Sequence, residues 1–200
     1  MACYDLFNGD ADGIASLQQL RLHEPRDCKL ITGLKRDINL FRYIEPAAGD
    51  RIVALDISMD KNREGVERAL AAGAEVFYAD HHYAGEPIES ERLDRHIHTD
   101  ADTCTSLIVS SLLDHVYLPW ALVGLYGDNL YATAELLADR ESLSRHDREA
   151  LKEMGTCLNY NGYGFDLDDL IYHPADLYRR IRPYEDPRGF METDDYRRLR

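Results

Sequence analysis

The sequence is short of positive charge. Its 200 residues include 23 Lys and Arg against 37 Asp and Glu, which gives a formal net charge of -14 and a pI near 4.9. Proteins that hold long nucleic acids through phosphate contacts usually present a basic face, so this composition disfavours such a partner. A small phosphorylated molecule or a short oligonucleotide fits the charge better.

Cysteine pairs and long apolar runs are also missing. The four cysteines, Cys3, Cys28, Cys104 and Cys157, form no CxxC pair, and scattered cysteines of this kind are typical of reduced core thiols in the cytoplasm. We therefore expect a cytoplasmic protein without a disulfide framework. Acidic and polar residues begin at Asp5, so we expect no signal peptide, and no apolar run is long enough to span a membrane.

Short apolar segments alternate with amphipathic ones in the first half of the chain. Strands are predicted at residues 2–7, 29–32, 51–55 and 75–79, with helices at residues 14–23 and 62–72. This alternation predicts an α/β fold, in which a parallel sheet carries helices on both faces.

The second half is predicted to be helical. Helices are expected from Thr103 or Thr105, at residues 118–126, and at residues 143–158 with Ser144 as the cap, followed by a loop at residues 159–164. Trp120 is expected in the core. We assign residues 1–165 to one domain and residues 166–200 to a helical or linker segment.

Acidic residues follow three of the predicted strands. They are Asp10 and Asp12, then Asp56, then Asp80 with His81 and His82. Because the carboxyl ends of parallel strands face one crevice, we expect these side chains to converge. Carboxylates gathered in this way repel one another unless cations neutralise them, and an oxygen-rich site with one or two imidazoles suits Mn²⁺ or Mg²⁺.

Each of these pieces has an ordinary alternative. The Asp10–Gly13 turn is equally typical of an acidic loop with a capping aspartate, and Asp56 or Asp128 can simply end an element. Adjacent histidines can cap a helix or lie exposed. An EF-hand is excluded, because the position that requires Glu is Arg21.

The order of the motifs resembles the DHH phosphoesterase superfamily, which is named for its Asp-His-His motif. Residues 8–13, 54–56, 80–82 and 127–128 look like its four motifs, and the resemblance covers about residues 2–135. Members include the RecJ exonuclease, oligoribonucleases, cyclic-dinucleotide phosphodiesterases and family II inorganic pyrophosphatases. The resemblance implies a phosphoesterase that uses two Mn²⁺ or Mg²⁺ ions to activate water, with residues 1–165 as its catalytic domain. Members usually add a C-terminal substrate domain, and no motif for one follows Asp166. The chain is then either a minimal member or, as we expect, a fragment whose residues 166–200 lead to that domain.

The resemblance also implies a role for each matching residue. The metal ligands would be Asp10, Asp12, Asp56, His81 and Asp128, with Asp56 bridging the two ions. The catalytic residues would be His82, which contacts the substrate phosphate or assists the leaving group, and Asp80, which orients a histidine.

Two departures from the family pattern affect the first metal. Leu6 stands where many members have a histidine ligand, and Asn8 stands where RecJ-like members have an aspartate. Asn8 is a doubtful, neutral ligand, so we expect one firm metal position and one weaker position. An inorganic pyrophosphatase or polyphosphatase, and a nucleotide-binding module without turnover, are the alternatives.

Other candidates are weaker. Arg36 can reach a substrate phosphate or be a surface charge, and Thr105 can offer a phosphate site at a helix start or be an ordinary cap. His96 and His98 are expected on a loop. Residues 159–164 can line the cleft, with Tyr160 or Tyr163 stacked on a base, or form a plain surface loop.

Overall fold

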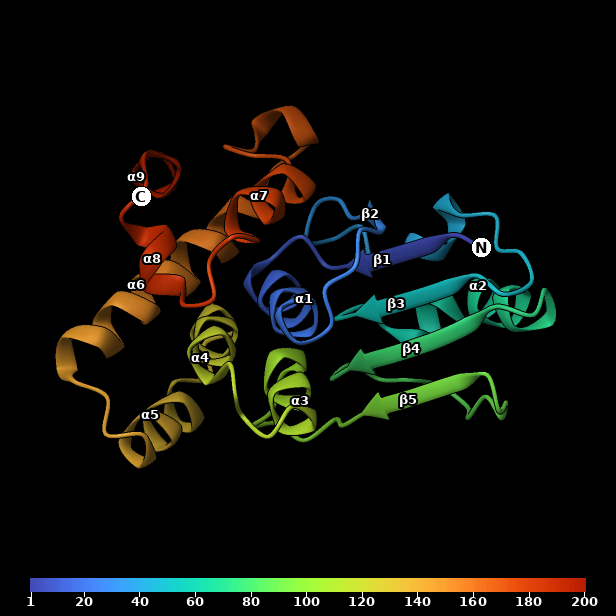
Figure 1. The fold of residues 1–200 in the computed structure, drawn as a ribbon, viewed down its shortest axis with the longest axis horizontal. Coiled ribbons are helices and arrows are strands. Elements are labelled where there is room, and N and C mark those ends of the chain that lie inside the picture. The colour runs from blue at the N-terminus through green and yellow to red at the C-terminus, as the bar shows by residue number, and fades with distance from the viewer.

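All five strands run parallel in one sheet, as the alternation of elements predicts (Figure 1). The computed structural model describes residues 1–200. Its strands are β1 (Cys3–Phe7), β2 (Lys29–Ile31), β3 (Arg51–Leu55), β4 (Glu75–Asp80) and β5 (Leu93–Ile97). Their spatial order is β2-β1-β3-β4-β5. The connection after β1 leads to β2 on one side of β1, and the connection after β2 leads to β3 on the other side. Ligands bind outside the carboxyl ends of the strands at such a switch point.

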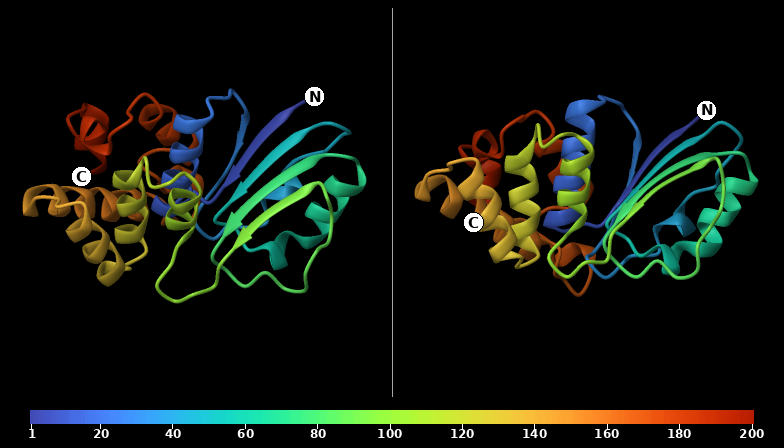
Figure 2. Two further views of the ribbon diagram at one scale, coloured as in Figure 1. Left: turned by 60° about the horizontal axis from the view of Figure 1, so that its bottom comes forward. Right: turned by 90° about the horizontal axis from the view of Figure 1, so that it is seen from below.

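Helices cover both faces of the sheet, but unequally. Helix α2 (Met59–Ala71) packs on one face, where it buries Val66 and Ala69 against apolar side chains of β1, β3 and β4. Helices α1 (Ala11–His23) and α3 (Thr105–Leu112) lie on the other face, toward the carboxyl ends of the strands. Figure 2 shows that this second face is uncovered toward the amino ends.

The remaining helices extend the fold beyond α1 and α3 (Figure 1). They are α4 (Leu118–Gly127), α5 (Tyr131–Arg140), α6 (Arg145–Asn161), α7 (Pro174–Ile181), α8 (Pro187–Met191) and α9 (Asp194–Leu199), with 3₁₀ turns at Leu40–Tyr43 and Leu167–Asp169. Trp120 is fully buried in α4, as predicted, and its Nε1 donates to the Glu185 carbonyl at 2.8 Å. Ser144 caps α6 by accepting from the Asp147 N–H at 3.1 Å.

Residues 166–200 belong to the same core as the helices before them. Leu177, Ile181 and Phe190 are fully buried in the cluster that also holds Trp120 and the inner face of α1. The predicted division at residue 165 and the predicted further domain stay predictions. None of the helices is both long and apolar enough to cross a membrane.

Two local predictions are wrong. His96 lies in β5 rather than on a loop, and β5 pairs in parallel with β4 at the edge of the sheet. The predicted loop at residues 159–164 begins too early, because α6 continues to Asn161.

The prediction of four reduced cysteines is also wrong. Cys3 and Cys28 form a disulfide, whereas Cys104 and Cys157 are free. The parallel register sets Tyr4 opposite Lys29, so the cysteines that precede them are neighbours, with Cα atoms 4.7 Å apart. The expectation of a cytoplasmic location rested on reduced thiols and loses that support.

Candidate metal centre

The predicted acidic residues and histidines meet at the carboxyl ends of three strands. Asp10 and Asp12 follow β1 at the start of α1, Asp56 follows β3, and Asp80 ends β4 just before His81 and His82. Asp128 reaches the same place from the C-terminal end of α4.

Two glycines of α4 bring Asp128 to this place. A Cβ on Gly124 would lie 2.1 Å from Ser106 Oγ, and a Cβ on Gly127 would lie 2.4 Å from Ala11 Cβ. Only glycine permits these approaches, so α4 packs directly against the first turns of α1 and α3. The end of α4 is thereby held beside the residues that follow β1.

His81 lies at the centre of three carboxylates. Its Nε2 is 3.4 Å from Asp56 Oδ1, 3.6 Å from Asp128 Oδ2 and 3.9 Å from Asp12 Oδ2. Ligand atoms that share one Mn²⁺ or Mg²⁺ at about 2.1 Å each are separated by about 3 to 4 Å. Asp12, His81 and Asp128 offer ligand atoms that all lie within 4.8 Å of one another, and so do Asp56, His81 and His82. The spacing and the chemistry of these donors fit a divalent cation.

The start of α3 fixes Asp12. The backbone N–H groups of Thr105 and Ser106 donate to its two carboxylate oxygens at 2.7 and 2.8 Å, in the manner of an anion held at a helix N-terminus. The Thr105 hydroxyl donates to Asp56 Oδ1 at 3.0 Å. Thr105 is fully buried, and both of its donors are engaged with carboxylates rather than free for a substrate phosphate.

Asp56 occupies a strained position. Its φ of 59° lies in the left-handed region, which few residues other than glycine and asparagine adopt. Its carboxyl is buried, and burial together with the charges of Asp12 and Asp10 raises its pKa well above the ordinary value. The backbone thus holds a carboxylate where its neighbours oppose its charge, which is the situation that a bound cation relieves.

The pKa values of Asp12 and Asp128 shift in opposite directions. Burial would raise the pKa of Asp12, but His81 and the Ser106 donors outweigh it and keep that pKa below the ordinary value. Burial and the charges of Asp12 and Asp10 raise the pKa of Asp128 to about 8. The cluster holds more carboxylate than the surrounding groups neutralise, and this supports the fit of a divalent cation.

Asp80 orients His82 and not His81. The Nδ1 of His82 lies 2.7 Å from Asp80 Oδ1, and this hydrogen bond raises the pKa of His82 despite its partial burial. Asp80 is fully buried, and its Oδ2 has no hydrogen-bond partner. His82 is the more exposed of the two histidines, with 44% of its side chain accessible against 21% for His81.

Asp10 is engaged differently from the other carboxylates. Its Oδ1 accepts from the backbone N–H groups of Asp12 and Gly13 at 3.1 Å, so it caps α1. Its Oδ2 lies 2.7 Å from Lys35 Nζ. Asn8, the doubtful ligand, is buried, and its side-chain oxygen has no hydrogen-bond partner.

Lys35 was missed by sequence reasoning, which chose its neighbour Arg36. Arg36 turns away and donates to the carbonyls of Gly164 and Phe165. Burial would lower the pKa of Lys35, but Asp10 and Asp128 raise it above its ordinary value. Its place in the sequence could have indicated Lys35, because the turn after β2 lies at the same end of the strands as the acidic turns.

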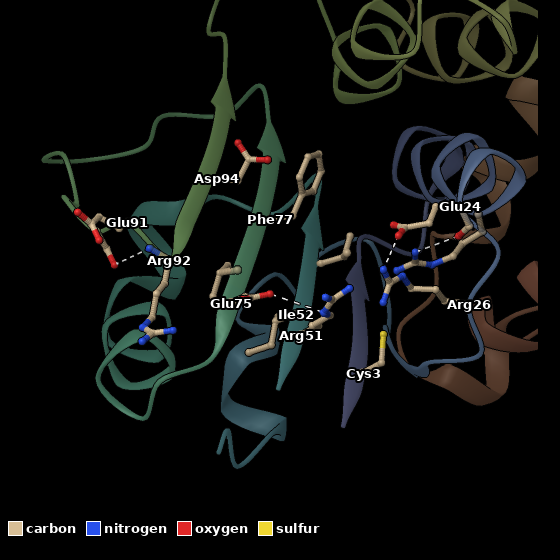
Figure 3. Close-up of a pocket in the computed structure, with 14 residues that line it drawn as sticks. Cys3, Glu24, Arg26, Arg51, Ile52, Glu75, Phe77, Glu91, Arg92 and Asp94 are labelled. Carbon is tan, nitrogen blue, oxygen red and sulfur yellow. Dashed lines mark hydrogen bonds and ion pairs between the residues drawn. The ribbon is translucent and has the colours of Figure 1, made fainter. Parts of the chain in front are cut away.

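A separate hollow of about 740 Å³ lies over the uncovered face of the sheet (Figure 3). It is lined by Arg51, Glu75, Phe77 and Asp94, among others, and Arg51 Nε lies 3.6 Å from Glu75 Oε2. No residue of the acidic cluster lines it. Its charges are mixed and partly paired, and the acidic cluster lies at the other end of the strands.

The comparison with solved structures gives the same fold. Over 99% of this chain, a crystal structure of exonuclease RecJ bound to manganese superposes with a TM-score of 0.59 at 14% identity. The chain spans 61% of the length of that exonuclease.

Two further matches are weaker. RecJ in complex with Mn²⁺ from Thermus thermophilus has a TM-score of 0.46 at 13% identity, over 99% of this chain and 37% of that one. An uncharacterized protein from Helicobacter pylori has a TM-score of 0.43 at 17% identity, over 99% and 67%. Scores below 0.5 do not define a shared fold. No family model and no curated protein matches the chain.

The parallel sheet flanked by helices and the RecJ superposition agree with the expected fold. The chain therefore has a DHH-like α/β fold.

Proposed function

We propose that this chain is a Mn²⁺- or Mg²⁺-dependent hydrolase of phosphate esters. The observation that carries the proposal is the position of His81 Nε2 within 3.4 to 3.9 Å of carboxylate oxygens from Asp12, Asp56 and Asp128. These four residues would hold the ion. When bound, such an ion lowers the pKa of water to yield a nucleophile and stabilises the charge that develops on the phosphoryl oxygens.

His82 is suited to hand a proton to the leaving oxygen. Its Nδ1 is bound to Asp80, so Nε2 is the atom left for the substrate. The raised pKa keeps a larger fraction of the imidazole protonated near neutral pH, as a general acid requires. The buried Asp80 fixes the tautomer and the ring orientation, as carboxylates do for catalytic histidines.

The proposed substrate is a phosphodiester or phosphomonoester of a small nucleotide or a short oligonucleotide. Two exposed aromatic side chains support a nucleobase rather than bare pyrophosphate: Tyr83 and Tyr163 are 72% and 60% accessible. Tyr83 follows the DHH motif directly, and the ring of Tyr163 lies 5.5 Å from Lys35 Nζ. Exposed aromatics beside a charged site are typical stacking surfaces for bases.

The test is hydrolysis of bis-p-nitrophenyl phosphate with and without Mn²⁺. Asp56→Asn should lower the Mn²⁺-dependent rate at least about 100-fold, because it removes a charged ligand while Asn tolerates the same backbone. Asp114→Asn is the matched control, since Asp114 has a φ of 50° and lies exposed outside the cluster. Equal losses in both variants would refute the assignment.

Two other results would replace the proposal. Phosphate release from pyrophosphate but not from diesters would identify a pyrophosphatase or polyphosphatase. Nucleotide binding without turnover at any Mn²⁺ concentration would identify a binding module that has lost catalysis.

A further inference from the structure

The ammonium of Lys35 occupies a cation position within the acidic cluster. Its Nζ lies 2.7 Å from Asp10 Oδ2, 2.8 Å from Asn159 Oδ1 and 3.6 Å from Asp128 Oδ1. All three neighbours present oxygen atoms. This is the kind of oxygen-rich surrounding in which a divalent cation or an ammonium can reside.

The backbone holds Lys35 there. Its N–H donates to the Gly162 carbonyl at 3.0 Å, which ties the turn after β2 to the end of α6. A Cβ on Gly9 would lie 2.0 Å from the Gly33 carbonyl oxygen, so the turns after β1 and β2 are in direct contact. The amine is therefore positioned by three elements and differs from a mobile surface lysine.

Asp128 divides the cluster into two cation positions. Its Oδ1 faces Lys35 at 3.6 Å, whereas its Oδ2 faces His81 at 3.6 Å. The position near His81 is bordered by carboxylate oxygens of Asp12, Asp56 and Asp128. The position near Asp10 already contains a positive charge from the protein, and both oxygens of Asp10 are engaged with Lys35 and the first turn of α1.

We propose that Lys35 serves as a built-in cation in place of one of the two ions that the motif pattern predicts, so that this site takes a single divalent ion. The inference rests on the proposed function. The ammonium neutralises Asp10 and Asp128 and stands beside the single ion, where it contacts a phosphoryl oxygen of the substrate. Unlike a second metal ion, it supplies charge and hydrogen bonds but no activated water.

The test is the Mn²⁺ stoichiometry of the full chain, measured by equilibrium dialysis with elemental analysis and by electron paramagnetic resonance. The wild type should bind one Mn²⁺ per chain and give the spectrum of an isolated ion. Lys35→Gln should bind two, with the spectrum of a coupled pair, because ions about 3.5–4 Å apart interact magnetically. Lys35→Arg, which keeps the charge, and Lys61→Gln, on the exposed surface of α2, should each bind one.

Two Mn²⁺ ions in the wild type would overturn the inference and leave the phosphoesterase proposal standing. A single ion with unchanged affinity in a folded Lys35→Gln variant would also overturn it, and circular dichroism checks the fold. No Mn²⁺ binding together with no hydrolysis would overturn the proposed function itself, which distinguishes the two failures.

Discussion

Raising the pH of the metal-free protein from about 5.5 to about 8.5 should weaken its folded state, and Asp128 should account for much of the loss. Its folded-state pKa is raised to about 8 from an ordinary 3.8 by burial and by the charges of Asp12 and Asp10. Between these values the folded chain keeps a proton that the unfolded chain has released. The stabilisation from that proton is complete below the ordinary pKa and is lost as the pH rises through about 8.

The magnitude follows from the span of the titration. From pH 5.5 to a pKa of about 8 is about 2.5 pH units, and at about 1.4 kcal/mol per unit the loss amounts to about 3 kcal/mol. Most of the Asp128 side chain is buried, with 15% accessible, so water screens little of this energy. Mn²⁺ at 100 times its dissociation constant should restore about 2.7 kcal/mol at the higher pH.

The assay is urea unfolding in a chelator at both pH values, for the wild type, Asp128→Asn and the control Asp114→Asn. Asp128→Asn should reduce the pH dependence by about 3 kcal/mol, whereas the control should match the wild type. The pKa of His82 is also raised, so His82 too contributes a loss of stability as the pH rises. The difference between Asp128→Asn and the control therefore isolates the contribution of Asp128. The reasoning fails if the wild type is equally stable at both pH values, or if Asp128→Asn keeps the slope of the control.

Three other perturbations test the packing around the site. Gly124→Ala should cost about 1–3 kcal/mol in urea unfolding and weaken Mn²⁺ binding in calorimetry, because its Cβ would overlap Ser106 Oγ at 2.1 Å. Arg21→Met should cost about 3–5 kcal/mol, since it leaves the buried carboxylate of Asp5 unpaired, and adding Asp5→Asn should recover much of the loss. Cys28→Ser should cost about 2–4 kcal/mol, and a thiol titration of the unfolded wild type should find two reactive groups before reduction and four after it.

The predicted strands are those whose sequences contain a short apolar run. Residues 51–55 and 75–79 are central in the sheet, and their apolar runs mark them clearly. Strand β5 was not predicted, because Asp94, Arg95 and His96 give it the composition of a loop, whereas β2, at the opposite edge of the sheet, keeps Leu30 and Ile31 side by side. An edge strand needs apolar residues on one face at most, so its local sequence carries little signal.

The disulfide could not be predicted from the spacing of the cysteines in the sequence. Cys3 and Cys28 become neighbours only through the parallel pairing of β1 with β2, in which Tyr4 lies opposite Lys29. Strand β2 has three residues, and a one-residue change of register would separate the cysteines. Asp10, Asp12, Asp56 and the two histidines were easier to place, because they follow strands whose carboxyl ends the topology fixes, whereas Asp128 ends helix α4.

The rule that places the carboxylates at the carboxyl ends of the parallel strands also places Lys35 there. A metal site predicted from acids and imidazoles alone does not include a lysine. In the turn after β2, the prediction names Arg36 and not Lys35. The fold selects Lys35 over Arg36, because the N–H of Lys35 bonds to Gly162 and its amine reaches Asp10 and Asn159. Gly162 and Asn159 lie at a helix end more than 120 residues away. A sequence shows that such a cluster needs positive charge. How much of that charge the chain itself supplies depends on which side chains the tertiary fold turns inward.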